Sequence, residues 1–274
     1  MLKMSKIILT IAGSDSSGGA GVQADIKTIT ALGSYAASAI TAITAQNTLG
    51  VSKVQLLDAH LVQAQIVAVL DDIGADIIKI GMLGSAELIR AVAEVLRKFD
   101  IPIVLDPVMV AKGGAHLLPE TAKTALIEEL LPQAFLLTPN IPEAEALTEK
   151  QIVDVDGQQT AARELLALGP KAVLVKGGHL PGAVINDVLL WAHGEAVFSS
   201  PRINTRHTHG TGCTLASAIA TYVAQGLSLE EAVRMGRKYV QKAIECAPGL
   251  GQGHGPLGHG FSCGSKPAHP VSLV

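Results

Sequence analysis

The chain has 274 residues, of which 48% are hydrophobic and 16% are charged, and its formal net charge is −3. Such a chain can bury a large core, and no low-complexity linker divides it. The slight negative charge, with no block of Lys or Arg, excludes a general electrostatic attraction to nucleic acid or to an anionic membrane, so we expect small-molecule partners.

The cysteines and the apolar runs bear on the compartment. Cys213, Cys246 and Cys263 are too few and too scattered for a disulfide scaffold, which fits a reducing compartment. The apolar run at residues 7–9 is too short for a signal sequence, and no run approaches the ~20 residues that cross a bilayer. We therefore expect a cytoplasmic protein with a single domain over residues 1–274, in which residues 265–274 form a tail.

Short apolar runs typical of buried strands alternate with helical patterns along the chain. The predicted strands cover residues 6–12, 38–45, 77–80, 103–105, 135–137, 172–175 and 187–191. The predicted helices cover residues 21–32, 60–73, 85–99, 119–130 and 158–168, with one more after residue 213 and another from Ser228 to near Pro248. This alternation predicts an α/β fold with a mostly parallel sheet, helices on both of its faces and ligands at the carboxyl ends of the strands.

The first loop, residues 12–21, is rich in glycine and serine. A P-loop would need Lys and then Ser or Thr after Gly18, but Gly19 and Ala20 stand there. Residues 19–24 match the dinucleotide pattern G-x-G-x-x-A, yet no acid that could bind a ribose occurs between Asp25 and Asp58. We therefore do not expect a nicotinamide or flavin cofactor.

Three single residues are candidates for contact with a flat ligand. Asp25 lies one helical turn after the glycine loop, where it can meet a ligand or simply favour the positive helix end. Gln46 follows an apolar strand, and its amide can pair with the donor and acceptor edge of a heterocycle. Met82 can pack on a ring, although methionine is more often a core residue.

Two acids and a lysine follow later strands. Asp106 and Glu143 each fit a turn or a helix cap when taken alone. As a pair near an anion site they indicate a divalent cation, because Mg²⁺ in phosphoryl-transfer sites uses few protein carboxylates and takes other ligands from nucleotide phosphates. Lys176 ends a further strand, where it can neutralise a phosphate or be an ordinary solvated lysine.

Residues 209–214, His-Gly-Thr-Gly-Cys-Thr, join a glycine-rich turn to a helix start. Two glycines let backbone N–H groups converge on one point, and the first helical turn adds unpaired donors and the positive end of the macrodipole. The pattern predicts an anion hole in which the same field stabilises the thiolate of Cys213. The alternative is an ordinary glycine turn with a buried cysteine.

Together these motifs resemble the ribokinase-like superfamily, and within it the hydroxymethylpyrimidine/phosphomethylpyrimidine kinase family of thiamine biosynthesis. The resemblance spans residues 8–261. It rests on segments 10–21, 23–25, 44–48, 106–109, 140–143, 175–179, 209–213 and 253–257.

The resemblance implies a three-layer α/β/α sandwich with no separate lid domain, and dimers. It also implies an enzyme that uses ATP and Mg²⁺ to phosphorylate 4-amino-5-hydroxymethyl-2-methylpyrimidine and then its monophosphate. Carried over by motif, the pyrimidine-binding residues are Gly13, Asp25, Gln46, Met82 and Val108. Asp106 and Glu143 would bind Mg²⁺, while the ATP phosphates would meet Asn140, Glu143, Lys176, Thr211 and Gly212. Gly210, Thr211, Gly212 and Cys213 would form the anion hole and, with Lys176, the catalytic set.

One departure from the superfamily concerns the base. Many sugar kinases of the group have Asp at the position of Cys213, and a thiolate can accept the far more basic hydroxyl proton only late in the reaction. Two alternatives stay open. One is pyridoxal kinase, a family that usually has Asp there, and the other is a pyrimidine-binding protein that has lost catalysis.

Overall fold

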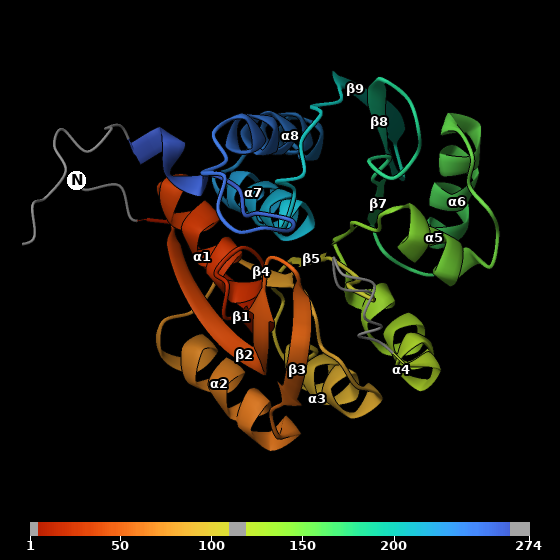
Figure 1. Cartoon of the computed structure of the whole chain (residues 1–274). Coiled ribbons are helices and arrows are strands. Elements are labelled where there is room, and N and C mark those ends of the chain that lie inside the picture. Colours follow the sequence, from red (N-terminus) through yellow and green to blue (C-terminus); the bar gives the residue numbers. More distant parts are fainter. Residues whose placement is uncertain (1–4, 110–118, 264–274) are drawn as a thin grey trace, which may run out of the picture.

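The computed structural model describes residues 5–109 and 119–263 (Figure 1). Its nine described strands form one sheet in the order β3-β2-β1-β4-β5-β6-β7-β8-β9. The pairs from β2 to β7 are parallel, and the pairs β2–β3, β7–β8 and β8–β9 are antiparallel. The strands are β1 (Ile7–Asp15), β2 (Tyr35–Asn47), β3 (Gly50–Leu56), β4 (Ile77–Ile80), β5 (Ile103–Leu105), β6 (Leu136–Leu137), β7 (Ala172–Val175), β8 (Val184–Trp191) and β9 (Gly194–Pro201). The predicted mostly parallel sheet is confirmed.

Helices cover both faces of the sheet, so the predicted three-layer arrangement is also confirmed (Figure 1). One face carries α2 (Ala59–Asp72), α3 (Ala86–Leu96), α4 (Glu120–Ala125), α5 (Ile141–Thr148) and α6 (Val155–Ala167). The other face carries α1 (Gly21–Ala31), α7 (Thr211–Ala224) and α8 (Leu229–Glu245). Neighbouring residues of β1, such as Ile8 and Leu9, belong to the two opposite cores, which explains why the central strands are apolar throughout.

Five elements differ from the predicted ones. Strands β3 and β9 are absent from the prediction because they are the two edge strands of the sheet and carry many exposed residues. The predicted helix 119–130 is α4 followed by a π-helical turn, Leu126–Leu130, and then a 3₁₀ turn, Leu131–Gln133. Helix α5 was not predicted as a helix, and a last 3₁₀ turn covers His259–Cys263.

The topology brings the candidate residues to one edge of the sheet. Strand order reverses beside β1, because the chain first adds β2 on one side and later β4 on the other. In parallel sheets, ligands bind at the carboxyl ends of strands near such a reversal. Asp106 follows β5, Asn140 follows β6 and Lys176 follows β7, and an isolated parallel bridge joins Asn140 to Lys176.

Among the described helices, none combines the length and the apolar character needed to cross a membrane. The predicted tail at residues 265–274 lies outside the described residues, so the single-domain boundary stays a prediction.

Candidate functional site

A cavity of about 1070 Å³ opens at the carboxyl ends of the parallel strands. Segments far apart in the sequence meet there, from the end of β1 to the start of α7 and one side of α8. Among the predicted site residues, those that line the cavity are Gly13, Gln46, Met82, Asp106, Val108, Asn140, Glu143, Lys176, Gly210, Thr211, Gly212 and Cys213.

The glycine turn that precedes α7 has the predicted form. Gly210 is the residue before the helix and has a φ of 85°, in the left-handed region that favours glycine. A Cβ at this position would lie 1.8 Å from the carbonyl oxygen of Gly19. The N–H of Thr214 donates to Gly210, whereas the N–H groups of Gly212 and Cys213 belong to a first helical turn, which offers them no intrahelical acceptor. The turn thus presents backbone donors at the positive end of α7.

Asp106 and Lys176 meet this helix start. Lys176 Nζ lies 2.7 Å from Asp106 Oδ1, which also accepts a hydrogen bond from Thr138 Oγ1 at 3.1 Å. A Cβ added to Gly212 would lie 3.4 Å from Lys176 Nζ and 3.5 Å from Asp106 Oδ2. Gly212 therefore leaves a small open space between the helix start, a buried carboxylate and an ammonium group. Desolvation opposes the charge on Lys176, but Asp106 and Glu143 outweigh it and raise the pKa of the lysine.

Glu143 and Asn140 form a capping box at the start of α5. Asn140 Oδ1 accepts from the N–H of Glu143 at 2.9 Å, and Glu143 Oε2 accepts from the N–H of Asn140 at 2.8 Å. The N-x-x-E motif therefore has a local structural role, and both residues also line the cavity. Burial raises the pKa of Glu143 to about 7; Lys176 lowers it and the nearby Asp106 raises it.

The two acids suit a divalent cation. Asp106 and Glu143 lie close enough for each to oppose the charge of the other, and a bound cation would relieve this repulsion. Carboxylate oxygens are the ligands that Mg²⁺ prefers, and in nucleotide sites it needs few of them because phosphates supply the rest. The donor set therefore fits Mg²⁺ as the resemblance implies.

Cys213 differs from its prediction. Burial is the main cause of the raised pKa of its thiol. Lys79 lowers this pKa and Asp25 raises it, and the resulting pKa is about 11. The helix start therefore does not stabilise a thiolate at neutral pH, because desolvation outweighs the helix field. Cys213 is a protonated thiol that lines the cavity, and its backbone N–H contributes to the anion-binding turn.

At the other end of the cavity lie the residues predicted to meet the pyrimidine. Gln46 is the second-last residue of β2. Met82 follows β4, and its carbonyl oxygen accepts a hydrogen bond from the hydroxyl of Thr41. A Cβ on Gly13 would lie 3.6 Å from Met82 Sδ, so the missing side chain keeps this part of the cavity open. Val108 lines the same cavity through the loop after β5.

Asp25 is buried and is not among the residues that line the cavity, and its assignment to pyrimidine binding stays a prediction. Its carboxylate is buried behind the anion-binding turn and accepts hydrogen bonds from Thr10, Lys79 and Ser217. Lys79 lies inside an apolar strand, which was the available signal, because a buried lysine requires an acidic partner. This cluster joins α1, α7, β1 and β4 beneath the site.

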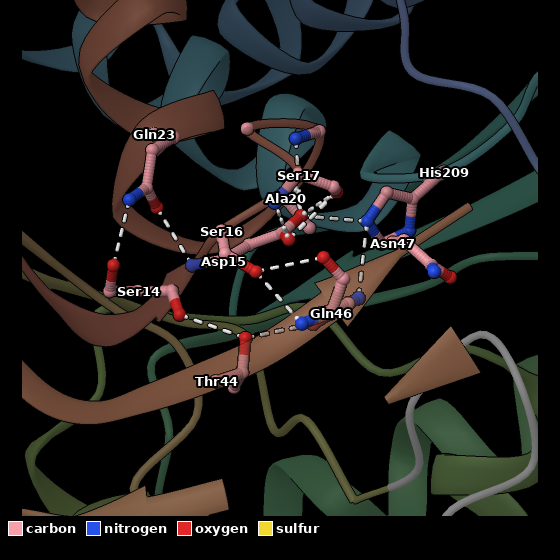
Figure 2. A network of polar contacts seen from close by, with 12 residues as sticks. Ser14, Asp15, Ser16, Ser17, Ala20, Gln23, Thr44, Gln46, Asn47 and His209 are labelled. Carbon is pink, nitrogen blue, oxygen red and sulfur yellow. Dashed lines mark hydrogen bonds and ion pairs between the residues drawn. The ribbon is translucent and has the colours of Figure 1, made fainter. Parts of the chain in front are cut away.

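Further site residues were not predicted. Asp15 and His209 form a buried pair beside Gln46 within a network of polar contacts (Figure 2). On the far side, Arg237 of α8 pairs with Asp187 of β8 at 2.7 Å, and Asp187 also accepts from the N–H of Gly177. Apolar residues near this pair that line the cavity are Ile185, Leu215, Val240 and Ile244. Those from β8 and α8 lie in segments that carry none of the motifs named above.

This arrangement, with an anion-binding helix start at a single large cavity, defines the chain as a phosphotransferase of the ribokinase-like class. A family profile described as phosphomethylpyrimidine kinase matches residues 15–258. The chain belongs to this family.

Similar proteins agree with this assignment. The chain is 52% identical over 92% of its length to a thiamine biosynthesis bifunctional protein of Geobacter sulfurreducens, of which it spans only 52%. It is 47% identical to a hydroxymethylpyrimidine/phosphomethylpyrimidine kinase of Streptomyces coelicolor, over 94% of this chain and 96% of that protein. Among solved structures, a pyridoxal kinase from Staphylococcus aureus in complex with ADP has 35% identity and a TM-score of 0.88, over 94% of both chains.

Proposed function

We propose that this protein transfers the terminal phosphoryl group of ATP to the hydroxymethyl group of 4-amino-5-hydroxymethyl-2-methylpyrimidine, and then phosphorylates the monophosphate to the diphosphate. The observation that carries this proposal is the position of Gly212, whose missing side chain leaves space beside both Asp106 and Lys176 at the start of α7. The family and the Streptomyces relative supply the substrate class.

The residues divide the work between the two ends of the cavity. Gln46, Met82, Gly13 and Val108 bind and orient the flat pyrimidine. The N–H groups of Gly212 and Cys213, with the ammonium of Lys176, stabilise the charge on the phosphoryl group in flight. Phosphoryl transfer has a loose transition state, so positioning and charge stabilisation lower most of the barrier, and a protonated Cys213 is compatible with it. Asp106 and Glu143 would hold Mg²⁺, which supplies charge neutralisation for the nucleotide phosphates when it is bound.

The nucleotide occupies the part of the cavity near α8 in this proposal. Ile185, Val240 and Ile244 offer apolar surface for a base, and Arg237 is held in place by Asp187. The solved pyridoxal kinase with bound ADP supports a nucleotide as co-substrate of this fold.

Pyridoxal kinase activity is the second candidate. The fold similarity favours it, but the higher identity to the pyrimidine kinase and the presence of Cys213 in place of Asp favour the pyrimidine. A binding protein without catalysis would have no need of the Asp106–Lys176 pair beside the helix start. We also propose that the enzyme acts in the cytoplasm as a homodimer, as the family resemblance implies.

The test is a phosphorylation assay with the hydroxymethylpyrimidine, its monophosphate and pyridoxal, each with and without Mg²⁺. We expect Mg²⁺-dependent turnover of both pyrimidines with a higher kcat/KM than for pyridoxal. A higher kcat/KM for pyridoxal would favour the second candidate. Tight pyrimidine binding without ATP turnover would support the non-catalytic alternative.

A further inference from the structure

Asp15 and His209 form a buried pair beside Gln46 (Figure 2). His209 Nε2 lies 2.8 Å from Asp15 Oδ2, and this oxygen also accepts from the N–H groups of Gly19 and Ala20. The other oxygen, Oδ1, accepts from the N–H and the hydroxyl of Ser17. Asp15 thus sits in a shell of donors, which is the environment of an ionised carboxylate.

The charge on Asp15 decides where the imidazole hydrogen lies. Burial opposes ionisation of Asp15 most strongly, but hydrogen bonds from His209, Ser17 and Ala20 outweigh it and lower its pKa. An ionised carboxylate only accepts hydrogen bonds, so His209 Nε2 must carry a hydrogen and donate it to Asp15. His209 therefore offers a hydrogen, and not a lone pair, to any other group near Nε2.

Gln46 is that other group. Its backbone is fixed, because Ser16 Oγ donates to its carbonyl oxygen and accepts from its N–H, each at 2.8 Å. Its side-chain nitrogen lies 3.3 Å from His209 Nε2, while its side-chain oxygen accepts from Thr44 Oγ1 at 3.2 Å. With Asp15 ionised, the two nitrogens that face each other both carry hydrogen, so their contact is not a hydrogen bond.

A half-turn of the Gln46 amide removes this conflict. It places the side-chain oxygen against the N–H of His209, and the nitrogen against Thr44 Oγ1. Thr44 can accept there, because its own hydrogen is donated to the carbonyl oxygen of Ser14 at 3.0 Å. The hydrogens that Thr44, His209 and Gln46 direct at one another then all have acceptors, and the second amide hydrogen of Gln46 is left to a ligand.

We propose that Asp15 and His209 are positioning residues that hold the Gln46 amide in this rotated orientation when the pyrimidine binds, and that they thereby select the ring edge the enzyme accepts. This inference rests on the proposed function. An amide presents one donor and one acceptor side by side, and an aminopyrimidine presents a ring nitrogen acceptor beside an amino donor. The two edges pair in one order only, so fixing the amide fixes which way the ring lies and where its hydroxymethyl group points.

The backbone around His209 supports a fixed imidazole. Its N–H donates to the carbonyl oxygen of Gly255 at 3.1 Å, and a parallel bridge joins it to Pro256. A Cβ on Gly19 would lie 2.5 Å from His209 Cδ2, so glycine is needed there for the ring to reach Asp15. The glycine loop and the segment near residue 255 therefore hold the ring from two sides.

The test compares two substrates that differ only in the order of donor and acceptor. One is the 4-amino-5-hydroxymethyl-2-methylpyrimidine, and the other is its 4-oxo analogue, whose ring nitrogen donates and whose oxygen accepts. We expect the wild type to prefer the amino compound by about 100-fold or more in kcat/KM, because a site built to hydrogen-bond one pattern leaves buried groups unpaired with the other. H209F removes the imidazole hydrogen while Asp15 keeps its four other donors, and it should reduce the preference to within about tenfold.

Three further variants complete the experiment. H209Q restores an N–H near the same place and should recover much of the preference. H209L removes the hydrogen with a more flexible side chain, and it decides the question if H209F does not fold. H254F makes the same exchange at an exposed histidine near Gln46 and should leave the preference unchanged.

The outcomes separate the two proposals. If the folded His209 variants lose activity on both substrates equally and keep the wild-type preference, His209 has only a structural role and this inference is wrong. If the wild type phosphorylates neither pyrimidine, the proposed function itself fails.

Discussion

Lys79 and Asp25 form an ion pair in which both side chains are fully buried, with Lys79 Nζ 2.9 Å and 3.0 Å from the two carboxylate oxygens. The pair lies behind Cys213, and Ser217 of α7 donates to the same carboxylate at 2.7 Å. It therefore ties the helix that begins at the anion-binding turn to the sheet beneath it.

Breaking this pair should be costly, whereas removing both charges should not. We expect K79M or D25N alone to lower the free energy of unfolding by about 3–5 kcal/mol, because each leaves a buried charge without its partner. The double variant K79M/D25N should recover most of that loss, since no buried charge remains. Urea unfolding of the four proteins measures this. A double variant as unstable as the sum of the two single losses would contradict the argument.

Stability should depend on pH through His259. Burial is the main reason that the pKa of His259 falls to about 4, and its neutral Nε2 lies 2.9 Å from Thr214 Oγ1 in the first turn of α7. In the unfolded chain the imidazole of His259 takes up a proton near pH 6.5, whereas in the folded protein it stays neutral until about pH 4. The stability that neutral His259 provides is therefore fully present above pH 6.5 and is lost as the pH falls towards 4. Between pH 7.5 and 5, the wild type should lose about 2 kcal/mol relative to H259Q.

The comparison with H259Q is necessary because Glu143 titrates in the opposite sense. The pKa of Glu143 is raised to about 7, so between pH 4.5 and 7 its carboxyl group is protonated in the folded state and ionised in the unfolded state. Glu143 therefore adds stability as the pH falls through this range. Both proteins share Glu143, so their difference isolates His259. An unchanged difference between pH 7.5 and 5 would show that His259 titrates normally in the folded protein.

Two glycines of the anion-binding turn should respond differently to alanine. G212A should fold at least as stably as the wild type, because the added methyl group makes only ordinary contacts and Ala exceeds Gly in helix stability by about 1 kcal/mol. Its methyl group would fill the space beside Lys176 and Asp106, so kcat/KM should fall by about 100-fold or more. G210A is the matched contrast, since its φ of 85° and the nearby Gly19 carbonyl make it destabilising. Thermal unfolding and steady-state kinetics together test this, and full activity in G212A would remove the anion-binding turn from the mechanism.

Replacing Cys213 should reduce the rate of phosphoryl transfer only modestly. Because its thiol has a pKa of about 11, it is protonated at neutral pH and cannot act as a base. We expect C213A to slow single-turnover phosphorylation by less than about tenfold with little change in pyrimidine binding, whereas loss of a general base costs about 10²–10⁴-fold. A loss in that larger range would show that substrate binding converts Cys213 into a thiolate.

The sequence was sufficient for features that depend on local pattern. Buried parallel strands such as β4 and β5 were predicted at their observed bounds because they are continuous apolar runs. The turn at Gly210 was predictable because glycine readily adopts the left-handed conformation that a sharp turn before a helix requires.

The sequence was insufficient where tertiary contacts decide. Asp25 looked like a ligand-binding acid because its partner, Lys79, is 54 residues away. The raised pKa of Cys213 comes from burial, which no spacing reveals. The Asp15–His209 pair joins residues 194 positions apart, so neither residue alone indicated the network around Gln46.

The most direct measurement is a crystal structure with the hydroxymethylpyrimidine and a non-hydrolysable ATP analogue bound together. We expect the terminal phosphoryl group to lie against the N–H groups of Gly212 and Cys213, within reach of Lys176, and the ring to be held by Gln46. A terminal phosphoryl group bound away from the start of α7, with the hydroxymethyl group directed elsewhere, would contradict it.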